Sequence, residues 1–245
     1  MQAAAKTDVG VMRQMNQDFC YANTKSEGLL PNLFIVADGM GGHNAGDFAS
    51  RFCVEKFVEL VTKAGPDVVS KLSFLEHAIK ETNEQLIIKA TENPELEGMG
   101  TTFVVATISP DNEMDVLNIG DSRLYLIDTD IRQITEDHSL VMEMVKNGEI
   151  KKEEARFHPK KNVVTRAISA IGVVIPDMFR VPVKKGDIIL MCSDGLSNMV
   201  ADNEIYAIIN ENRDDLNMAA DILIERANRN GGRDNITVVL IKIDD

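Results

Sequence analysis

The 245-residue chain has no apolar run long enough to cross a membrane, few cysteines, and fewer basic than acidic side chains. Its first residues also lack the basic segment and apolar stretch of a signal peptide, so we expect a cytoplasmic protein without membrane contact. The formal net charge of −13 argues against nucleic-acid binding, because phosphate contacts require clustered lysine and arginine.

The three cysteines, Cys20, Cys53 and Cys192, are far apart and form no Cys-x-x-Cys pair. Their odd number and apolar surroundings predict reduced core thiols. None is followed six positions later by arginine, which excludes the Cys-x5-Arg loop of thiolate phosphatases. The nucleotide-binding patterns GxGxxG and GxxxxGK[ST] are also absent, and Ser122 and Ser193 lack the His and Asp companions of a catalytic triad.

A hydrophobic content of 44% is typical of a globular protein, and no repeat or low-complexity linker interrupts it, so we expect one domain over residues 1–245. Apolar periodicity predicts the long helices and the strands. Helices are expected at about 45–63, from after 66 to about 91, at 202–210 and at 216–228. Strands are expected at 33–37, 101–109, 114–120, 123–128, 131–135, 178–183, 187–193 and 236–243.

The four strands between 101 and 135 are expected to form an antiparallel meander. Strands in the middle and at the end, with paired helices between them, indicate two antiparallel sheets flanked by helices, an α+β fold in four α-β-β-α layers. Residues 140–177 are expected to form an insertion over one end. Within it, residues 146–166 carry a net charge of +4, which indicates either a solvated helix face or a patch for an acidic or phosphorylated partner.

Four aspartates, Asp18, Asp38, Asp194 and Asp234, are expected where apolar runs break off. A Mg²⁺ or Mn²⁺ site needs such carboxylates held convergently by rigid elements. Asp38 and Asp194 each precede glycine; Asp-Gly alone is also a common turn. A pair of divalent ions can activate a water for attack on phosphorus, and Arg13, near Asp18, is the candidate for binding the phosphate oxygens.

Seven segments occur in order: TDVGVMRQMNQD, FIVADGMGGH, GMGTT, NIGDSRLY, ITEDHSL, LMCSDGL and GGRDNITVV. With these segments the chain resembles the metal-dependent serine/threonine protein phosphatases of type 2C, the PPM family, in its short bacterial form. The resemblance implies a helix-flanked β-sandwich with two Mn²⁺ or Mg²⁺ ions at one end. It also implies hydrolysis of phosphoserine and phosphothreonine by a metal-bridging hydroxide, without a covalent intermediate.

The resemblance also implies roles for individual residues. Asp38 would bridge both ions, the Gly39 carbonyl would bind one of them, and Asp194 and Asp234 would complete the other. Arg13 would hold the substrate phosphate. The partners would be phosphorylated proteins, targets of a bacterial Ser/Thr kinase, and a monomer is expected.

Two further aspartates have weaker roles in this scheme. Asp18 would act through bound water, and Asp121 would hold a third ion together with Asp194. The chain departs from many eukaryotic relatives at Gln17, where they have glutamate, and at Met40, where they have a histidine proposed as general acid. Another group must then protonate the leaving alkoxide.

Four other polar residues are expected to have structural roles. His43 is interpreted as a turn residue as readily as an acid. Thr101 and Thr102 are expected to begin a core strand near the metals, and Asn235 to orient a neighbouring aspartate. Residues 140–177 would be the flap beside the active site and contact the protein substrate.

Two alternatives to an active protein phosphatase stay open. One is a catalytically silent domain that binds phosphoproteins, although the presence of Asp38, Asp194, Asp234 and Arg13 favours activity. The other is a hydrolase of small phosphate esters, since nothing in the ligand set recognises the group beyond the phosphate.

Overall fold

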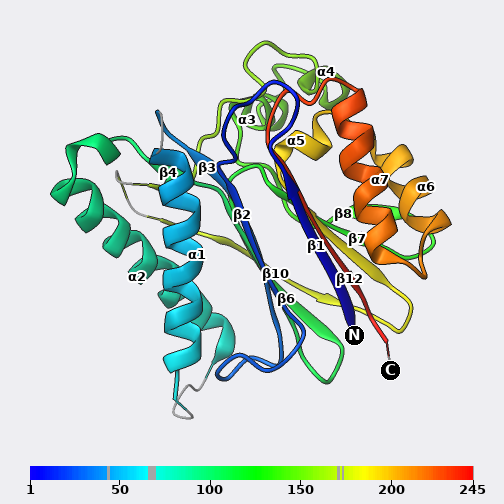
Figure 1. Cartoon of the computed structure of the whole chain (residues 1–245), viewed down its shortest axis with the longest axis horizontal. Coiled ribbons are helices and arrows are strands. Elements are labelled where there is room, and N and C mark those ends of the chain that lie inside the picture. The colour runs from blue at the N-terminus through cyan, green and yellow to red at the C-terminus, as the bar shows by residue number, and fades with distance from the viewer. Residues whose placement is uncertain (43–44, 66–69, 170–171, 173, 245) are drawn as a thin grey trace.

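The structure is a computed structural model that describes residues 1–42, 45–65, 70–169, 172 and 174–244. Two antiparallel sheets lie face to face, and helices cover both outer sides (Figure 1). The four-layer α+β fold is confirmed. His43 and the stretch 66–69, where the second helix was expected to begin, lie outside the described residues.

The first sheet has the strand order β1-β12-β11-β7-β8. It consists of β1 (Gln2–Asp8), β7 (Arg123–Ile127), β8 (Ile131–Gln133), β11 (Ile188–Cys192) and β12 (Ile236–Lys242). The second sheet has the order β10-β6-β5-β3-β4-β9, and β2 also pairs with β3. It consists of β2 (Asp18–Asn23), β3 (Leu33–Met40), β4 (Gly100–Thr101), β5 (Phe103–Ile108), β6 (Glu113–Ile119), β9 (Ile168–Ser169) and β10 (Asp177–Pro182).

The long helices cover the outer faces of the sheets. They are α1 (Ala45–Lys63) and α2 (Lys71–Glu92) on the second sheet, and α6 (Asp202–Glu211) and α7 (Leu216–Arg229) on the first (Figure 1). Three short helices gather at one end of the sandwich: α3 (Leu140–Lys146), α4 (Lys152–Ala155) and α5 (Asp194–Ser197). A 3-10 turn, η1 (Pro94–Leu96), follows α2. Among the described residues, no helix is long and apolar enough to cross a membrane.

The central strands are apolar on both faces because both faces are covered. Along β3, Leu33 and Ile35 pack against the helices, whereas Phe34 and Val36 pack between the sheets. β12 alternates in the same way between the α6–α7 side and the inter-sheet core. Burying each such side chain contributes about 1.5–3 kcal/mol, so the sandwich is a rigid base for the loops at its end.

The predicted meander is wrong. β5 pairs with β6 in the second sheet, and β7 pairs with β8 in the first, so the chain crosses between the sheets at residues 120–122. Gly120 makes this crossing with a φ of 107°, and a Cβ there would lie 2.6 Å from the Thr102 side chain. The residues between the two hairpins, Gly-Asp-Ser, resemble an ordinary turn, so the sequence does not distinguish this crossing from a hairpin.

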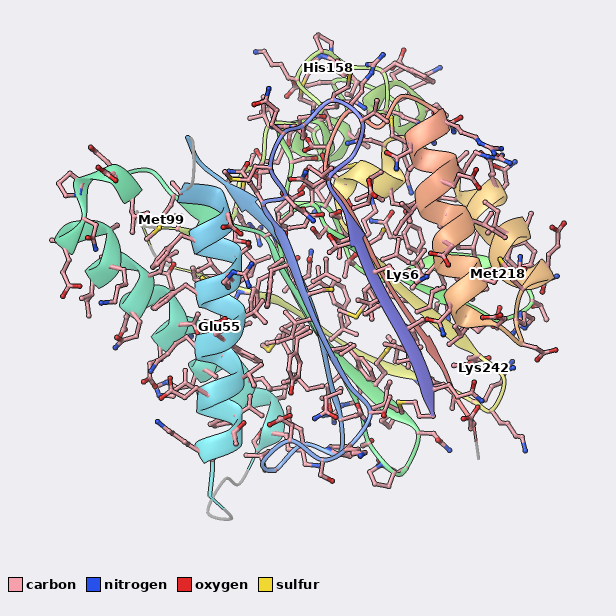
Figure 2. All side chains as sticks on the ribbon, in the orientation of Figure 1. Lys6, Glu55, Met99, His158, Met218 and Lys242 are labelled. Atoms are coloured by element: carbon pink, nitrogen blue, oxygen red, sulfur yellow. The ribbon has the colours of Figure 1, made fainter. Side chains whose placement is uncertain are left out.

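Strands β1 and β2 are absent from the sequence-based prediction. β1 reads QAAAKTD, which has low strand propensity, and it forms by pairing along its whole length with β12. Its Lys6, labelled in Figure 2, donates a hydrogen bond to Asp221 of α7. Asp18 is the first residue of β2 and Asp234 precedes β12, so neither aspartate ends an apolar run as expected.

The insertion at residues 140–177 is only partly helical. α3 and α4 lie at its start, and β9 pairs with β4, so its second half adds a short strand to the second sheet. All three cysteines are free; Cys53 and Cys192 are buried, and Cys20 is partly exposed.

Candidate metal centre

The aspartates predicted from the sequence converge at one end of the sandwich. Asp18 and Asp38 are cross-strand partners in β2 and β3. In the first sheet, Asp194 lies two residues after the end of β11, and Asp234 lies two residues before the start of β12. Cross-strand partners on a sheet have Cβ atoms about 5 Å apart, so the first pair is placed by register alone.

Asp18 joins the two sheets. Its Oδ2 accepts hydrogen bonds from Ser193 Oγ and Thr237 Oγ1, each at 2.7 Å, although Thr237 belongs to β12 of the first sheet and Ser193 directly follows β11. The Ser193 hydroxyl in turn accepts from the Thr237 amide at 2.9 Å. Ser193 is thus engaged in positioning Asp18.

The cluster is electrostatically strained. Burial, opposed in part by the two hydroxyl donors, raises the pKa of Asp18 to about 7. Burial, followed by the charges of Asp18, Asp194, Asp121 and Asp234, raises the pKa of Asp38 well above its usual value. Five carboxyls therefore act on one another at this end of the molecule, and bound cations would relieve the repulsion.

The other two buried acids behave in the same way. Burial, and then Asp194, raises the pKa of Asp121 to about 8. Burial, and then Asp234, raises the pKa of Asp194 to about 6. Two carboxylate oxygens, Asp18 Oδ1 and Asp194 Oδ1, are buried without a hydrogen-bond partner. A buried acceptor of this kind costs about 1–3 kcal/mol unless a cation or water satisfies it.

The donor set fits hard, hydrated cations. Among the described residues, no three His, Cys, Asp or Glu side chains form an ion site by themselves. Carbonyl oxygens and water must then complete the coordination, which is the usual arrangement for Mg²⁺ and unlike the Cys- and His-rich sites of Zn²⁺.

Gly39 can supply such a carbonyl because the backbone is packed closely there. Its amide donates to the Gln17 carbonyl at 3.0 Å, which fixes the peptide orientation. A Cβ on Gly39 would lie 2.1 Å from the Gly46 oxygen, and one on Gly46 would lie 2.8 Å from the Gly39 oxygen. Glycine is therefore required at both positions.

Two threonines hold the backbone of Asp38. The Asp38 amide donates to Thr102 Oγ1 at 2.9 Å, and the Asp38 carbonyl accepts from the Thr102 amide and from Thr101 Oγ1. Thr102 Oγ1 also bonds to Ser122 Oγ at 2.8 Å. The expected place of both threonines near the cluster is confirmed, but sequence reasoning missed that they position Asp38.

Arg13 lies beside the cluster on the loop between β1 and β2. Its Nη2 donates to Asp234 Oδ2 at 2.8 Å, and its side chain is 48% exposed, so its guanidinium can also reach a ligand from solvent. Asn235 holds this loop: its Nδ2 donates to the carbonyls of Val9 and Met15, and its Oδ1 accepts from the Gln17 amide. The Asn235 amide also donates to Asp234 Oδ1 at 2.9 Å, so the prediction that Asn235 orients a neighbouring aspartate is confirmed, through its backbone amide.

A polar chain links Asp194 to the 140–177 segment, and sequence reasoning missed it. Asn198 Nδ2 donates to Asp194 Oδ2 at 2.9 Å, and Lys161 Nζ donates to Asn198 Oδ1 at 2.9 Å. Burial lowers the pKa of Lys161. The (i, i+4) spacing of Asp194 and Asn198 on one helical turn was the available signal.

Comparison with known proteins identifies this arrangement. The family described as Protein phosphatase 2C matches residues 11–231. The serine/threonine phosphatase stp of Listeria monocytogenes is 42% identical over 256 residues, covering 100% of this chain and 96% of that protein. Protein phosphatase PhpP of Streptococcus pneumoniae is 37% identical over 251 residues, covering 100% and 98%.

Solved structures agree. The serine/threonine phosphatase PstP/Ppp of Mycobacterium tuberculosis superposes with a TM-score of 0.89 at 35% identity, covering 100% of this chain and 99% of that one. The PstP catalytic domain in complex with two manganese ions has a TM-score of 0.86 at 34% identity, covering 100% and 98%. The chain belongs to the protein phosphatase 2C family and is a metal-dependent serine/threonine protein phosphatase.

Proposed function

We propose that Asp38, the Gly39 carbonyl, Asp194 and Asp234 hold two divalent ions, Mn²⁺ or Mg²⁺, at the end of the sandwich. The observation that carries this proposal is the convergence of these aspartates from separate parts of the chain, with the Asp194 Oδ1 atom buried and unpaired. Bound ions would supply an activated water and offset phosphate charge.

Asp18 and Asp121 have supporting roles in this proposal. Asp18 keeps one oxygen on Ser193 and Thr237, which leaves Oδ1 to act through a metal-bound water. Asp121, which raises the pKa of Asp38 and is itself influenced by Asp194, would hold a third ion with Asp194.

Arg13 would bind the substrate phosphate. Its planar fork can donate to two nonbridging oxygens at once, and its exposed ion pair with Asp234 costs little to rearrange. The guanidinium would thereby orient the phosphate and stabilise charge that develops on its oxygens in the transition state.

The substrates are phosphoproteins, and we propose that they are targets of a bacterial Ser/Thr kinase. Residues 1–245 would form one domain in which residues 140–177 are a flap that contacts the substrate; the Lys161–Asn198–Asp194 chain supports a link between this flap and the centre. The monomeric state, the cytoplasmic location and the absence of nucleic-acid binding stay predictions.

The first test is hydrolysis of a phosphothreonine peptide with Mn²⁺, Mg²⁺ or EDTA, run beside the Asp194→Asn variant. Metal-dependent release that the variant lacks is expected. No release with any metal would instead favour the catalytically silent phosphoprotein-binding domain. Rapid turnover of small esters without turnover of the peptide would favour the small-ester hydrolase.

A further inference from the structure

A cleft of about 710 Å³ opens beside the carboxylate cluster. Asp121 and Asp194 line one end of it, and it continues past α4 and β8 to the start of α6. Its volume lies in the range of small-molecule sites and far exceeds a phosphate group, so it has room for side chains next to the scissile phosphate. Figure 2 places His158, which follows α4, at this end of the molecule.

Several acidic residues of the cleft are already paired. Asp137 accepts from Arg123 Nε at 2.9 Å and from Arg123 Nη2 at 2.7 Å, a bidentate pair. Glu136 accepts from Lys146 Nζ at 2.7 Å. These pairs contribute little net charge to the space that a ligand would occupy.

Three cations of the cleft lack an ion-pair partner among the described residues. Arg132 of β8, Lys152 of α4 and Arg156 directly after α4 line the cleft. None of them forms an ion pair or side-chain hydrogen bond with a described residue, although Arg132 acts electrostatically on Asp128. Away from the metal end, the acids of the cleft without an ion pair are Glu153 and Asp202, and Asp202 accepts a hydrogen bond from Tyr125. Away from the metal end, free positive charge therefore exceeds free negative charge.

We propose that this cleft binds a second anionic side chain of the phosphoprotein substrate, a carboxylate or another phosphate, a few residues from the scissile phosphoresidue. Arginines from two separate elements can converge on one anion, and their planar forks match carboxylate and phosphate oxygens. A chain of net charge −13 repels acidic peptides overall, so the three cations in the part of the cleft away from the metal end would select and steer them. This inference rests on the proposed function.

Lys161 is not suitable for testing the proposal, although it also lines the cleft. Its Nζ is engaged with Asn198 and hence with Asp194, so a substitution there would disturb the metal centre as well. Arg132 and Arg156 form no hydrogen bond to this Lys161–Asn198–Asp194 chain, although the charge of Arg156 acts on Lys161. Lys25 is the control, because it is exposed on the loop between β2 and β3, lies outside the flap and does not line the cleft.

The experiment measures kcat/KM of the Mn²⁺-loaded enzyme on phosphothreonine peptides with an otherwise neutral sequence. One glutamate, or one non-hydrolysable phosphonate analogue of phosphoserine, is moved over the four positions on either side. At one or more offsets we expect a gain of about threefold to tenfold for the wild type, as for partly enclosed charge pairs. R156E and R132E should remove the gain, and K25E should retain it.

Two further measurements separate the possible causes. Hydrolysis of p-nitrophenyl phosphate, which is too small to fill the cleft, reports whether the centre and the fold are intact in each variant. A phosphonate peptide without phosphothreonine is also tested as an inhibitor of hydrolysis. Inhibition by this peptide would show how strongly the phosphonate binds at the metal centre itself. Gains from the phosphonate alone would identify a second phosphate as the ligand, and gains from glutamate would include carboxylates.

Equal kcat/KM for all peptides, or a preference that survives in both R156E and R132E, would overturn the proposal. If the wild type also failed to hydrolyse p-nitrophenyl phosphate with any metal, the proposed function itself would be wrong.

Discussion

Replacing Asp194 by asparagine is expected to stabilise the metal-free protein while abolishing turnover. Burial and the charge of Asp234 raise the pKa of Asp194 from 3.8 to about 6. Ionising this carboxyl therefore costs about 3 kcal/mol more in the folded protein than in the unfolded chain, and partial exposure to water reduces the cost to about 1–2 kcal/mol. Asparagine removes the charge and can still accept the hydrogen bond from Asn198.

The direction of the pH dependence follows from the raised pKa. Asp194 destabilises the folded state once the pH exceeds 3.8, the cost grows until the pH reaches about 6, and it is constant above. At neutral pH and without metal, D194N should therefore have a free energy of unfolding about 1–2 kcal/mol higher than the wild type. This corresponds to a Tm higher by about 2–8 °C. Near pH 4 the two proteins should unfold alike.

Divalent ions should reverse this order. Mn²⁺ at about 100 times its Kd adds about 2.7 kcal/mol to the wild type, whereas a variant that lacks one anionic ligand gains much less. Thermal unfolding in EDTA and in Mn²⁺, together with peptide hydrolysis, measures both effects. D221N is the matched control: Asp221 is 58% exposed and paired with Lys6. A D194N protein less stable than the wild type in EDTA would refute the reasoning.

Three other substitutions test single elements of the site. Arg13→Ala should mainly raise KM for a phosphopeptide, with a smaller loss of kcat, and an unaltered KM would mean that Arg13 does not hold the phosphate. Asn235→Ala should lower the free energy of unfolding in urea by about 1–3 kcal/mol and also raise KM, because the loop of Arg13 loses three hydrogen bonds. If the free energy of unfolding fell and KM did not change, the hydrogen bonds of Asn235 would not position Arg13. Gly39→Ala should abolish metal binding as measured by calorimetry, since its Cβ would lie 2.1 Å from the Gly46 oxygen. Normal metal binding would show that residue 39 and the Gly46 carbonyl are not packed this closely.

The elements that could be predicted are those in which the pattern of apolar residues along the chain shows which faces are buried. β3 and β11 are apolar on both faces because they lie between a helix layer and the opposite sheet. The helices α1, α6 and α7 show the expected periodicity, and α1 has the predicted bounds. In each case the local pattern and the tertiary environment demand the same residues.

The elements that could not be predicted depend on distant partners. β1 has little strand propensity and exists because β12 supplies its hydrogen bonds. The crossing at Gly120 is invisible in the local pattern of β6 and β7, since each strand would fit a single sheet equally well. The positioning roles of Thr102 and Asn235 involve partners 64 and about 220 residues away, which a pattern along the chain does not contain.

The metal centre is also a seam between the two sheets. Asp18 of the second sheet is hydrogen bonded to Ser193 and Thr237 of the first, and Asn235 beside β12 fixes the loop that leads into β2. Carboxyls lie on both sides of this seam, and burial together with their mutual charges raises the pKa values of Asp18 and Asp38. Cations that bind carboxylates from both sheets would therefore join the sheets, and metal affinity and the stability of this end should change together in any variant of the cluster.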